Sequence, residues 1–212
     1  MIVLPIPERW RHYAILVEQR AGDVPDDSMF LPAELALRDL VALPRRRRDW
    51  TVSRTALKIL AQQRGAIAEA HDGLIESDAG SRPHLRDLAT GRSWCVSLSH
   101  SRGFAAAAVD RRPVGVDVEK VRPLSLSAAH LFLTDGERDE IESARIEDAL
   151  LHSWCAKEAA WKAISSMHET LKSVPLRLIE RGAQGLTFEG PALTIETRRI
   201  SPDLVAALAV TV

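Results

Sequence analysis

Acidic side chains alternate with valines in one short segment of the chain. Residues 114–119 read VGVDVE, so the valines alternate with Gly115, Asp117 and Glu119. Because successive side chains of a β-strand point to opposite faces, we expect Asp117 and Glu119 to share one face. Two carboxylates at this spacing can bind one hard divalent cation such as Mg²⁺, which prefers oxygen ligands. Acidic residues are also common on the solvent face of an edge strand, so the motif alone leaves both interpretations open.

A second group of candidates lies in WCAKEAAWK, residues 154–162, inside a predicted helix. Glu158 and Lys162 are four residues apart, so they share a helix face and could form a simple surface ion pair. Glu158 is also only about 40° to 60° around the helix from Trp154 and Trp161, at the edge of the apolar stripe. We therefore expect its carboxylate to be partly desolvated.

The segment SLSHS, residues 97–101, groups small hydroxyls with a histidine at a predicted hairpin corner. Hydroxyls and backbone amides donate hydrogen bonds to phosphate oxygens, and a nearby phosphate favours the charged form of His100. A polar turn without a ligand is the alternative. Further positive charge for a polyphosphate could come from basic residues upstream, namely Arg45–Arg48, Arg54, Lys58 and Arg82. For the four-arginine run Arg45–Arg48, a solvated basic face is the usual interpretation.

The elements that must position these residues follow from hydrophobic patterning. In the first half of the chain we expect a strand at 12–18, a helix at 32–40 and a second helix at 49–64. The outer face of the second helix is expected to be basic, and a long loop should follow at 72–91. A hairpin and a third strand should follow at 94–98, 104–109 and 114–118. The second half then predicts helices at 137–143 and 147–166 and strands at 176–180, 193–197 and 205–212.

Composition restricts the class of protein. The chain has 212 residues, 46% of them hydrophobic, and a formal net charge of −1, which is typical of an ordinary globular protein and not of a broad nucleic-acid binder. Its two cysteines, Cys95 and Cys155, are far apart and have no metal-ligand spacing, which favours a reducing compartment. The order of charges near the N-terminus does not fit a secretory signal, and no apolar run is long enough to span a membrane. We expect a cytoplasmic protein with no membrane partner.

Together and in this order, these segments resemble the Sfp-type 4'-phosphopantetheinyl transferases. That family carries a strand motif like GVDVE and then WxxKExxxK, and here 40 positions separate Asp117 from Lys157. SLSHS precedes GVDVE, SRPHL lies further upstream, and SRTAL supplies an arginine on the preceding helix. The resemblance covers residues from about 45 to 166.

The resemblance implies an α+β fold of two similar halves, 1–112 and 113–212, related by a pseudo-twofold axis with a ligand cleft between them. It implies transfer of 4'-phosphopantetheine from coenzyme A to a serine of an acyl or peptidyl carrier protein, as in holo-acyl-carrier-protein synthases, with Mg²⁺ and release of 3',5'-ADP. A monomer would suffice. After Lys162 the family usually has a glycine-containing loop, whereas residues 163–173 of this chain contain no glycine.

The roles of single residues are also implied by the resemblance. Asp117, Glu119 and Glu158 match the positions that hold Mg²⁺, and Lys162 matches the lysine that reaches the pyrophosphate. We expect Glu158, directly or through a metal-bound water, to be the general base and Lys162 to stabilise phosphate charge. The remaining matched positions bind coenzyme A through its phosphates and adenosine: Arg54, Arg82, Ser99 and His100.

Two other functions use the same residues. A magnesium-dependent nuclease could use the acidic trio, although the near-neutral net charge argues against nucleic acid as a partner. A catalytically silent module that binds coenzyme A or a carrier protein is the alternative from another class.

Overall fold

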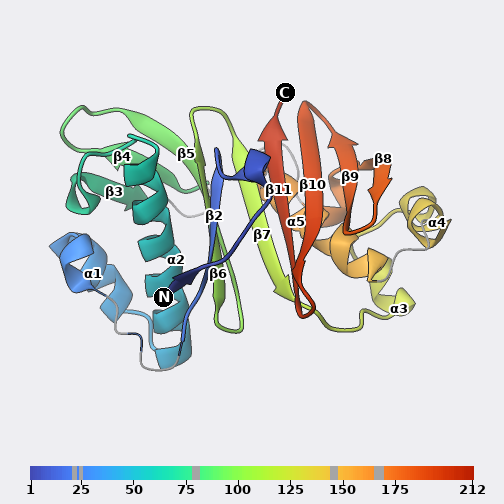
Figure 1. Ribbon diagram of the computed structural model, residues 1–212, viewed down its shortest axis with the longest axis horizontal. Coiled ribbons are helices and arrows are strands. Elements are labelled where there is room, and N and C mark those ends of the chain that lie inside the picture. Colours follow the sequence, from blue (N-terminus) through green and yellow to red (C-terminus); the bar gives the residue numbers. More distant parts are fainter. Residues whose placement is uncertain (21–22, 24–25, 78–81, 144–147, 165–169) are drawn as a thin grey trace. The chain divides into compact units, whose positions relative to one another are not determined.

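Two antiparallel β-sheets, each with one long helix packed on it, organise the described part of the chain (Figure 1). The computed structural model describes residues 1–20, 23, 26–77, 82–143, 148–164 and 170–212. These residues form two compact units, Met1–Arg112 (unit 1) and Pro113–Val212 (unit 2). Both units mix helices with antiparallel strands, which confirms the predicted α+β class. The pseudo-twofold relation stays a prediction.

Unit 1 contains a six-stranded sheet in the order β1-β2-β6-β5-β4-β3. Its strands and α-helices are β1 (Ile2–Val3), β2 (Ala14–Glu18), α1 (Pro32–Asp39), α2 (Pro44–Gln63), β3 (Gly73–Glu76), β4 (His84–Asp87), β5 (Ser93–Ser101) and β6 (Phe104–Asp110). Short 3₁₀ turns lie at Glu8–Trp10, Asp27–Met29 and Ala70–Asp72.

Helix α2 covers the sheet of unit 1 with an apolar face that includes Ala56, Leu57 and Leu60. The helix begins at Pro44, because proline at the first helical position lacks only an N–H that would have no partner in the helix. The predicted start at residue 49 was therefore too late, and the four arginines Arg45–Arg48 belong to the first turn and a half of α2.

The outer face of this helix was expected to be basic, but its Lys58 side chain is buried. The side chain is 0% exposed, and its ammonium donates to the Glu34 carboxylate of α1 at 2.6 Å and to the Met29 carbonyl at 2.9 Å. Glu34 also accepts the backbone N–H groups of Leu31 and Ile75. Lys58 is thus part of a buried ion pair that joins α1 to α2, and not a ligand-facing cation.

Two further expectations about unit 1 need correction. The predicted loop at 72–91 contains the short strands β3 and β4, which pair with each other and, through β4, with β5. The predicted hairpin corner at 97–101 is part of strand β5, because Ser99 and His100 pair with alanines of β6. The turn itself is only Arg102 and Gly103, both with positive φ (45° and 94°), as a tight hairpin requires.

Unit 2 contains a five-stranded sheet in the order β7-β11-β10-β9-β8. Its strands and α-helices are β7 (Val114–Lys120), α3 (Leu126–Ala129), α4 (Asp135–Ser143), α5 (Ala149–Ile164), β8 (Arg177–Gly182), β9 (Gly185–Gly190), β10 (Leu193–Ser201) and β11 (Leu204–Thr211), with a 3₁₀ turn at Leu171–Ser173. Strand β9 is absent from the sequence-based expectation. Strand β7, the third strand expected after the hairpin, pairs with β11.

Helix α5 packs on this sheet through a stripe of fully buried small residues: Cys155, Ala156, Ala159, Ala160 and Ala163. Small side chains allow the helix backbone to come close to the strands. The predicted ends of this helix, at 147 and 166, and the residues 165–169 of the glycine-free segment lie outside the described residues. Within the residues that the structure describes, no helix is long and apolar enough to cross a membrane.

Candidate active site

The closest approach between α5 and β7 occurs at Gly115. A Cβ atom built on this glycine would lie 1.8 Å from the carbonyl oxygen of Ala159 and 3.0 Å from the amide nitrogen of Ala163. No side chain fits there, so glycine is required by contact with the helix backbone. This approach places α5 over the face of β7 that carries Asp117 and Glu119, the next residues on the same side of the strand.

Asp117 is held by a lysine from the helix. Its side chain is 5% exposed, and the Lys162 ammonium donates to its Oδ1 at 2.8 Å and to the Val116 carbonyl at 3.2 Å. Glu158, the partner expected from helical spacing, is further from the same ammonium, at 3.9 Å. Burial lowers the pKa of Lys162, but the Asp117 carboxylate outweighs this effect, so the pKa lies above its ordinary value. Lys162 therefore carries its positive charge at neutral pH.

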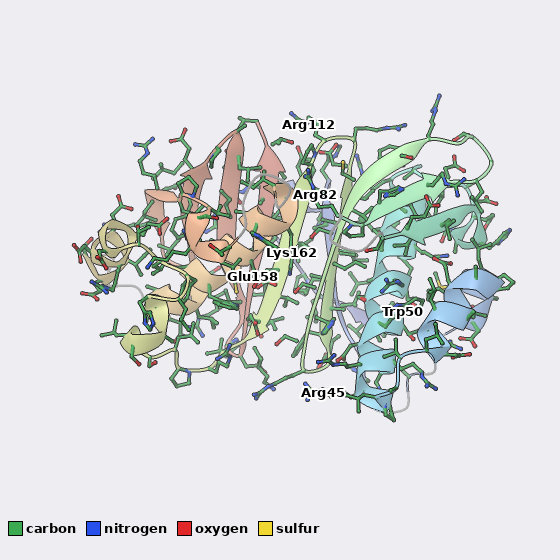
Figure 2. The ribbon with its side chains drawn as sticks, turned by 180° about the vertical axis from the view of Figure 1, so that it is seen from behind. Arg45, Trp50, Arg82, Arg112, Glu158 and Lys162 are labelled. Atoms are coloured by element: carbon green, nitrogen blue, oxygen red, sulfur yellow. The ribbon has the colours of Figure 1, made fainter. Side chains whose placement is uncertain are left out.

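Glu158 lies one turn before Lys162 on α5 (Figure 2) and is 23% exposed. Burial raises its pKa, the Lys162 ammonium lowers it, and the carboxylates of Asp117 and Glu119 raise it further, with a net upward shift. The desolvation expected from the position of Glu158 at the edge of the apolar stripe is thus present. The same interactions show that all three carboxylates lie within electrostatic reach of one another.

Glu119 is the third carboxylate, at the end of β7. The indole N–H of Trp154, on α5, donates to its Oε1 at 3.3 Å. The sequence pattern places Trp154 in the apolar stripe of the helix and at the start of the WxxKExxxK motif. Its hydrogen bond is a polar contact of the site that a helical pattern does not reveal.

The donor set is suitable for a hard divalent cation, although the side chains are not arranged around a common point. Within the described residues, no three or more His, Cys, Asp or Glu side chains form a group that could hold a metal ion. Three carboxylates and one ammonium nevertheless leave an excess of negative charge in a largely buried region, which a cation with oxygen ligands would offset. The neighbouring Cys155 thiol does not compete, because burial and the Asp117 carboxylate raise its pKa and keep it protonated.

The candidate residues of unit 1 lie in several places. On α2, the Arg54 guanidinium stacks on the ring of Trp50 at 4.1 Å from the ring centroid, and burial lowers its pKa to about 10. Even so, Arg54 is charged at neutral pH. It lies one turn from the buried pair of Lys58 and Glu34 and is already engaged with an aromatic ring.

Ser99 and His100 lie next to each other near the end of β5 but point to opposite faces. Ser99 is 8% exposed, whereas the His100 side chain is 51% exposed and its Nδ1 lies 3.8 Å from the Asp49 carboxylate of α2. His100 is therefore the accessible member of the pair. Arg82 precedes β4 and acts electrostatically on Cys95, which lies about 16 Å along β5 from His100.

A basic pocket of about 600 Å³ lies beside His100's partner Asp49. Its arginines come from the end of β2, from α2 and from the β5-β6 turn. The full lining is Gln19, Arg20, Arg45, Arg48, Asp49, Arg102 and Gly103. The sequence indicated Arg45 and Arg48 only as a run of charge. It gave no signal for Arg20 and Arg102, which come to the pocket through the β2-β6-β5 pairing.

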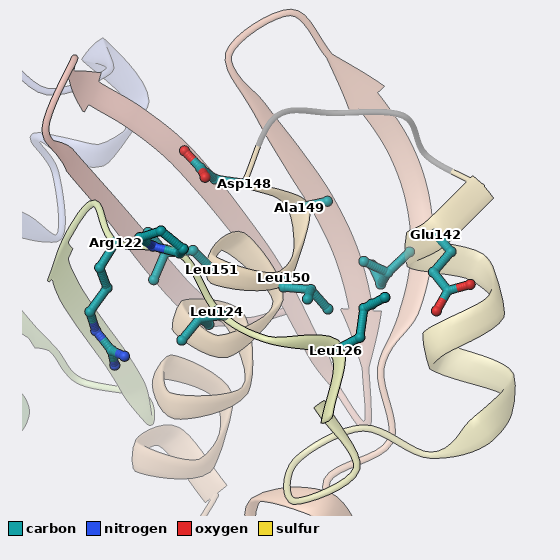
Figure 3. A pocket seen from close by; sticks show the side chains of 10 residues that line it. Arg122, Leu124, Leu126, Glu142, Asp148, Ala149, Leu150 and Leu151 are labelled. Carbon is teal, nitrogen blue, oxygen red and sulfur yellow. The ribbon is translucent and has the colours of Figure 1, made fainter. Parts of the chain in front are cut away.

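A second pocket, of about 340 Å³, lies in unit 2 at the start of α5 (Figure 3). Its lining is largely apolar and includes Leu124, Leu126 and Leu150, with Arg122, Glu142 and Asp148 at its edges. None of the three candidate metal-binding carboxylates lines it. The acidic site and this pocket are therefore separate features of the same unit.

The sequence of this chain is similar to those of known 4'-phosphopantetheinyl transferases. Residues 113–209 match the sequence model of the 4'-phosphopantetheinyl transferase superfamily. The chain is 30% identical over 136 residues to 4'-phosphopantetheinyl transferase psf-1 of Bacillus pumilus, covering 61% of this chain and 57% of that protein. It is 33% identical over 105 residues to ffp of Bacillus subtilis (48% and 46%) and 32% identical over 81 residues to Sfp of strain 168 (37% and 35%).

The matched part spans about half the length, or less, of these relatives. It includes the whole of β7 and α5, and hence all four side chains of the acidic site. Residues 113–209 therefore match the 4'-phosphopantetheinyl transferase superfamily, and the chain is similar in sequence to the 4'-phosphopantetheinyl transferases named above.

Proposed function

We propose that this protein transfers the 4'-phosphopantetheine group of coenzyme A to a serine of an acyl or peptidyl carrier protein, with Mg²⁺ as the metal. The observation that carries the proposal is the arrangement of Asp117, Glu119, Glu158 and Lys162 on β7 and α5. It combines carboxylates for a cation with a charged lysine, within the segment that matches the superfamily.

The proposed reaction is a phosphoryl-type transfer with no redox change. The serine Oγ forms a bond to the β-phosphorus of coenzyme A, and the bond from that phosphorus to the bridging oxygen of the pyrophosphate breaks. The products are the phosphodiester of the carrier and 3',5'-ADP. The hydroxyl proton must pass to a base.

Each side chain has a role that follows from its environment. Asp117, Glu119 and Glu158 would hold the cation, which when bound supplies neutralising charge and Lewis acidity toward pyrophosphate oxygens. Glu158 is also the candidate base, because it is the carboxylate that α5 places beside Lys162 at the proposed cation site. Lys162 remains protonated and would stabilise negative charge on the phosphates.

Unit 1 would contribute to coenzyme A binding. We assign the 3'-phosphate end to the basic pocket and to the exposed His100, because arginines and a histidine suit a phosphate. Ser99, Arg54 and Arg82 remain candidates for other contacts, with Arg54 limited by its stacking on Trp50.

The carrier protein is the expected macromolecular partner. We include acyl and peptidyl carriers alike, because the names of the relatives specify the reaction and not the carrier. We propose a monomer that acts in the reducing cytoplasm, and the free thiols of Cys95 and Cys155 support the reducing compartment.

A panel of purified apo carrier proteins incubated with the protein, Mg²⁺ and a fluorescent coenzyme A derivative tests the proposal. We expect at least one carrier to become labelled, with an equal amount of 3',5'-ADP measured by chromatography. Glu158→Gln should abolish most of the labelling, and Glu142→Gln, an equivalent loss of charge at an exposed residue of α4, should not. Coenzyme A binding without labelling of any carrier would contradict the proposal and favour a binding module.

A further inference from the structure

Helix α5 contacts both carboxylates of β7, each by a different kind of donor. Lys162 donates a charged hydrogen bond to Asp117 at 2.8 Å, and Trp154 donates a neutral one to Glu119 at 3.3 Å. Trp154 lies four residues before Glu158 and therefore on a neighbouring part of the same helix face. One helix thus carries one candidate ligand and positions the two others.

We propose that Trp154 is a positioning residue for the divalent cation, which acts by holding the Glu119 carboxylate through its indole N–H. The inference rests on the proposed function, since it assigns a role toward the metal of that site. Trp154 does not itself supply a ligand, because the indole nitrogen is a donor only.

The position of this donor is fixed by packing. The Trp154 ring meets the Phe132 ring edge to face, with 5.2 Å between centroids and an interplanar angle of 90°. Phe132 is 2% exposed and belongs to the core of unit 2. A ring anchored in this way presents its N–H in one direction, so it selects one orientation of the otherwise flexible Glu119 side chain.

A neutral donor also suits a carboxylate that must bind a cation. The N–H donates to Oε1 and adds no charge, so it does not offset the negative charge of the Glu119 carboxylate. A lysine at this position would instead bring a positive charge that repels the metal. Hydrogen-bond partners that orient metal ligands typically change metal affinity by about 10–100-fold when removed.

The competing interpretation is that Trp154 only fills the core beside Phe132. Trp154→Phe separates the two, because it keeps an aromatic ring for packing and removes the N–H. Trp94→Phe is the matched control. Trp94 in unit 1 also has a largely buried ring, and its Nε1 has no hydrogen-bond partner among the described residues, so this change removes an N–H that contacts no carboxylate.

The experiment is a titration of the full-length protein with Mn²⁺, followed by electron paramagnetic resonance of the free ion, with and without coenzyme A and with Mg²⁺ as competitor. We expect Trp154→Phe to raise the Kd for Mn²⁺ about tenfold, and Trp94→Phe to leave it within twofold of the wild type. In the transfer reaction, Trp154→Phe should raise the Mg²⁺ concentration for half-maximal rate by a similar factor and regain most of kcat at saturating Mg²⁺.

If Trp154→Phe does not fold, as judged by circular dichroism, Trp154 is replaced by benzothienylalanine, an analogue of the same size in which sulfur takes the place of the N–H. An unchanged Kd for Mn²⁺ in the folded variant overturns the inference, as does a wild-type protein that binds no Mn²⁺. A wild type that binds Mn²⁺ but labels no carrier contradicts the proposed reaction instead, so the two failures are distinguishable.

Discussion

Replacing Gly115 by alanine perturbs the contact on which the acidic site depends. The added Cβ would lie 1.8 Å from the Ala159 carbonyl oxygen and 2.8 Å from its carbon, whereas real Cβ contacts stay above 3.0 Å. Strand and helix must therefore separate by about 1.2 Å, the difference between 1.8 and 3.0 Å. Both partners are backbone, so no side-chain rotation can relieve the overlap.

Overpacking of a core typically costs about 1–3 kcal/mol, and a clash between backbones belongs at the upper end. For a chain of this length, about 3 kcal/mol corresponds to a fall in Tm of roughly 6–12 °C. The same movement carries α5 away from β7, so the 2.8 Å contact between Lys162 and Asp117 should lengthen or break. We therefore expect Gly115→Ala to lose stability and transfer activity together.

Urea denaturation followed by circular dichroism measures the stability change, and carrier labelling measures activity. Gly136→Ala is the matched control, because a Cβ on Gly136 of α4 meets nothing within 4 Å. It should leave activity unchanged and stabilise the protein by at most about 1 kcal/mol, since alanine is the better helix former. A Gly115→Ala protein whose free energy of unfolding is within about 0.5 kcal/mol of the wild type, well below the usual cost of overpacking, would refute the reasoning.

Three further predictions concern titratable side chains in the two units. Glu34→Ala should lower the free energy of unfolding by about 3–5 kcal/mol, because it leaves the fully buried Lys58 ammonium without its carboxylate; a loss below 1 kcal/mol in urea denaturation would contradict this. Burial lowers the pKa of His152 from 6.5 to about 4, so the folded state favours the neutral ring and loses up to about 3 kcal/mol of stability as pH falls from 6.5 to 4. His152→Gln should show a smaller loss over the same pH range, and an equal loss would show that His152 is not the group responsible. Glu158→Gln should lower kcat about 100-fold or more at saturating Mg²⁺ in the labelling assay, and full turnover would remove both roles assigned to Glu158.

The sequence was sufficient to predict those parts of the site that depend on local periodicity. Alternation in VGVDVE places Asp117 and Glu119 on one face of β7, and helical spacing places Glu158 at the edge of the apolar stripe of α5. Both patterns act within one element, where geometry follows directly from residue spacing.

Contacts between elements were not predictable in this way. Helical spacing favoured Glu158 as the partner of Lys162, yet the packing of α5 on β7 brings Asp117 closer. Lys58 looked like a surface cation because its counter-ion Glu34 lies on another helix. Hydropathy hides such pairs, since each charge appears exposed until its partner is known.

The short strands β3 and β4 were also missed, for a related reason. Each has four residues with few apolar positions, so their conformation depends on pairing with a neighbouring strand more than on their own pattern. Arg20 and Arg102 of the basic pocket likewise reach it through β-strand pairing and a hairpin turn, which local patterning does not reveal.

We propose that this chain attaches phosphopantetheine to a carrier serine with the help of a divalent cation. Intact-protein mass spectrometry of an apo carrier incubated with the protein, coenzyme A and Mg²⁺ tests it most directly. The account predicts a mass gain of one phosphopantetheine, lost when the carrier serine is replaced by alanine, when EDTA is added, or when Asp117→Asn is used. A gain that persists in EDTA, or on a carrier without its serine, would contradict the account, and so would the absence of any gain across acyl and peptidyl carriers.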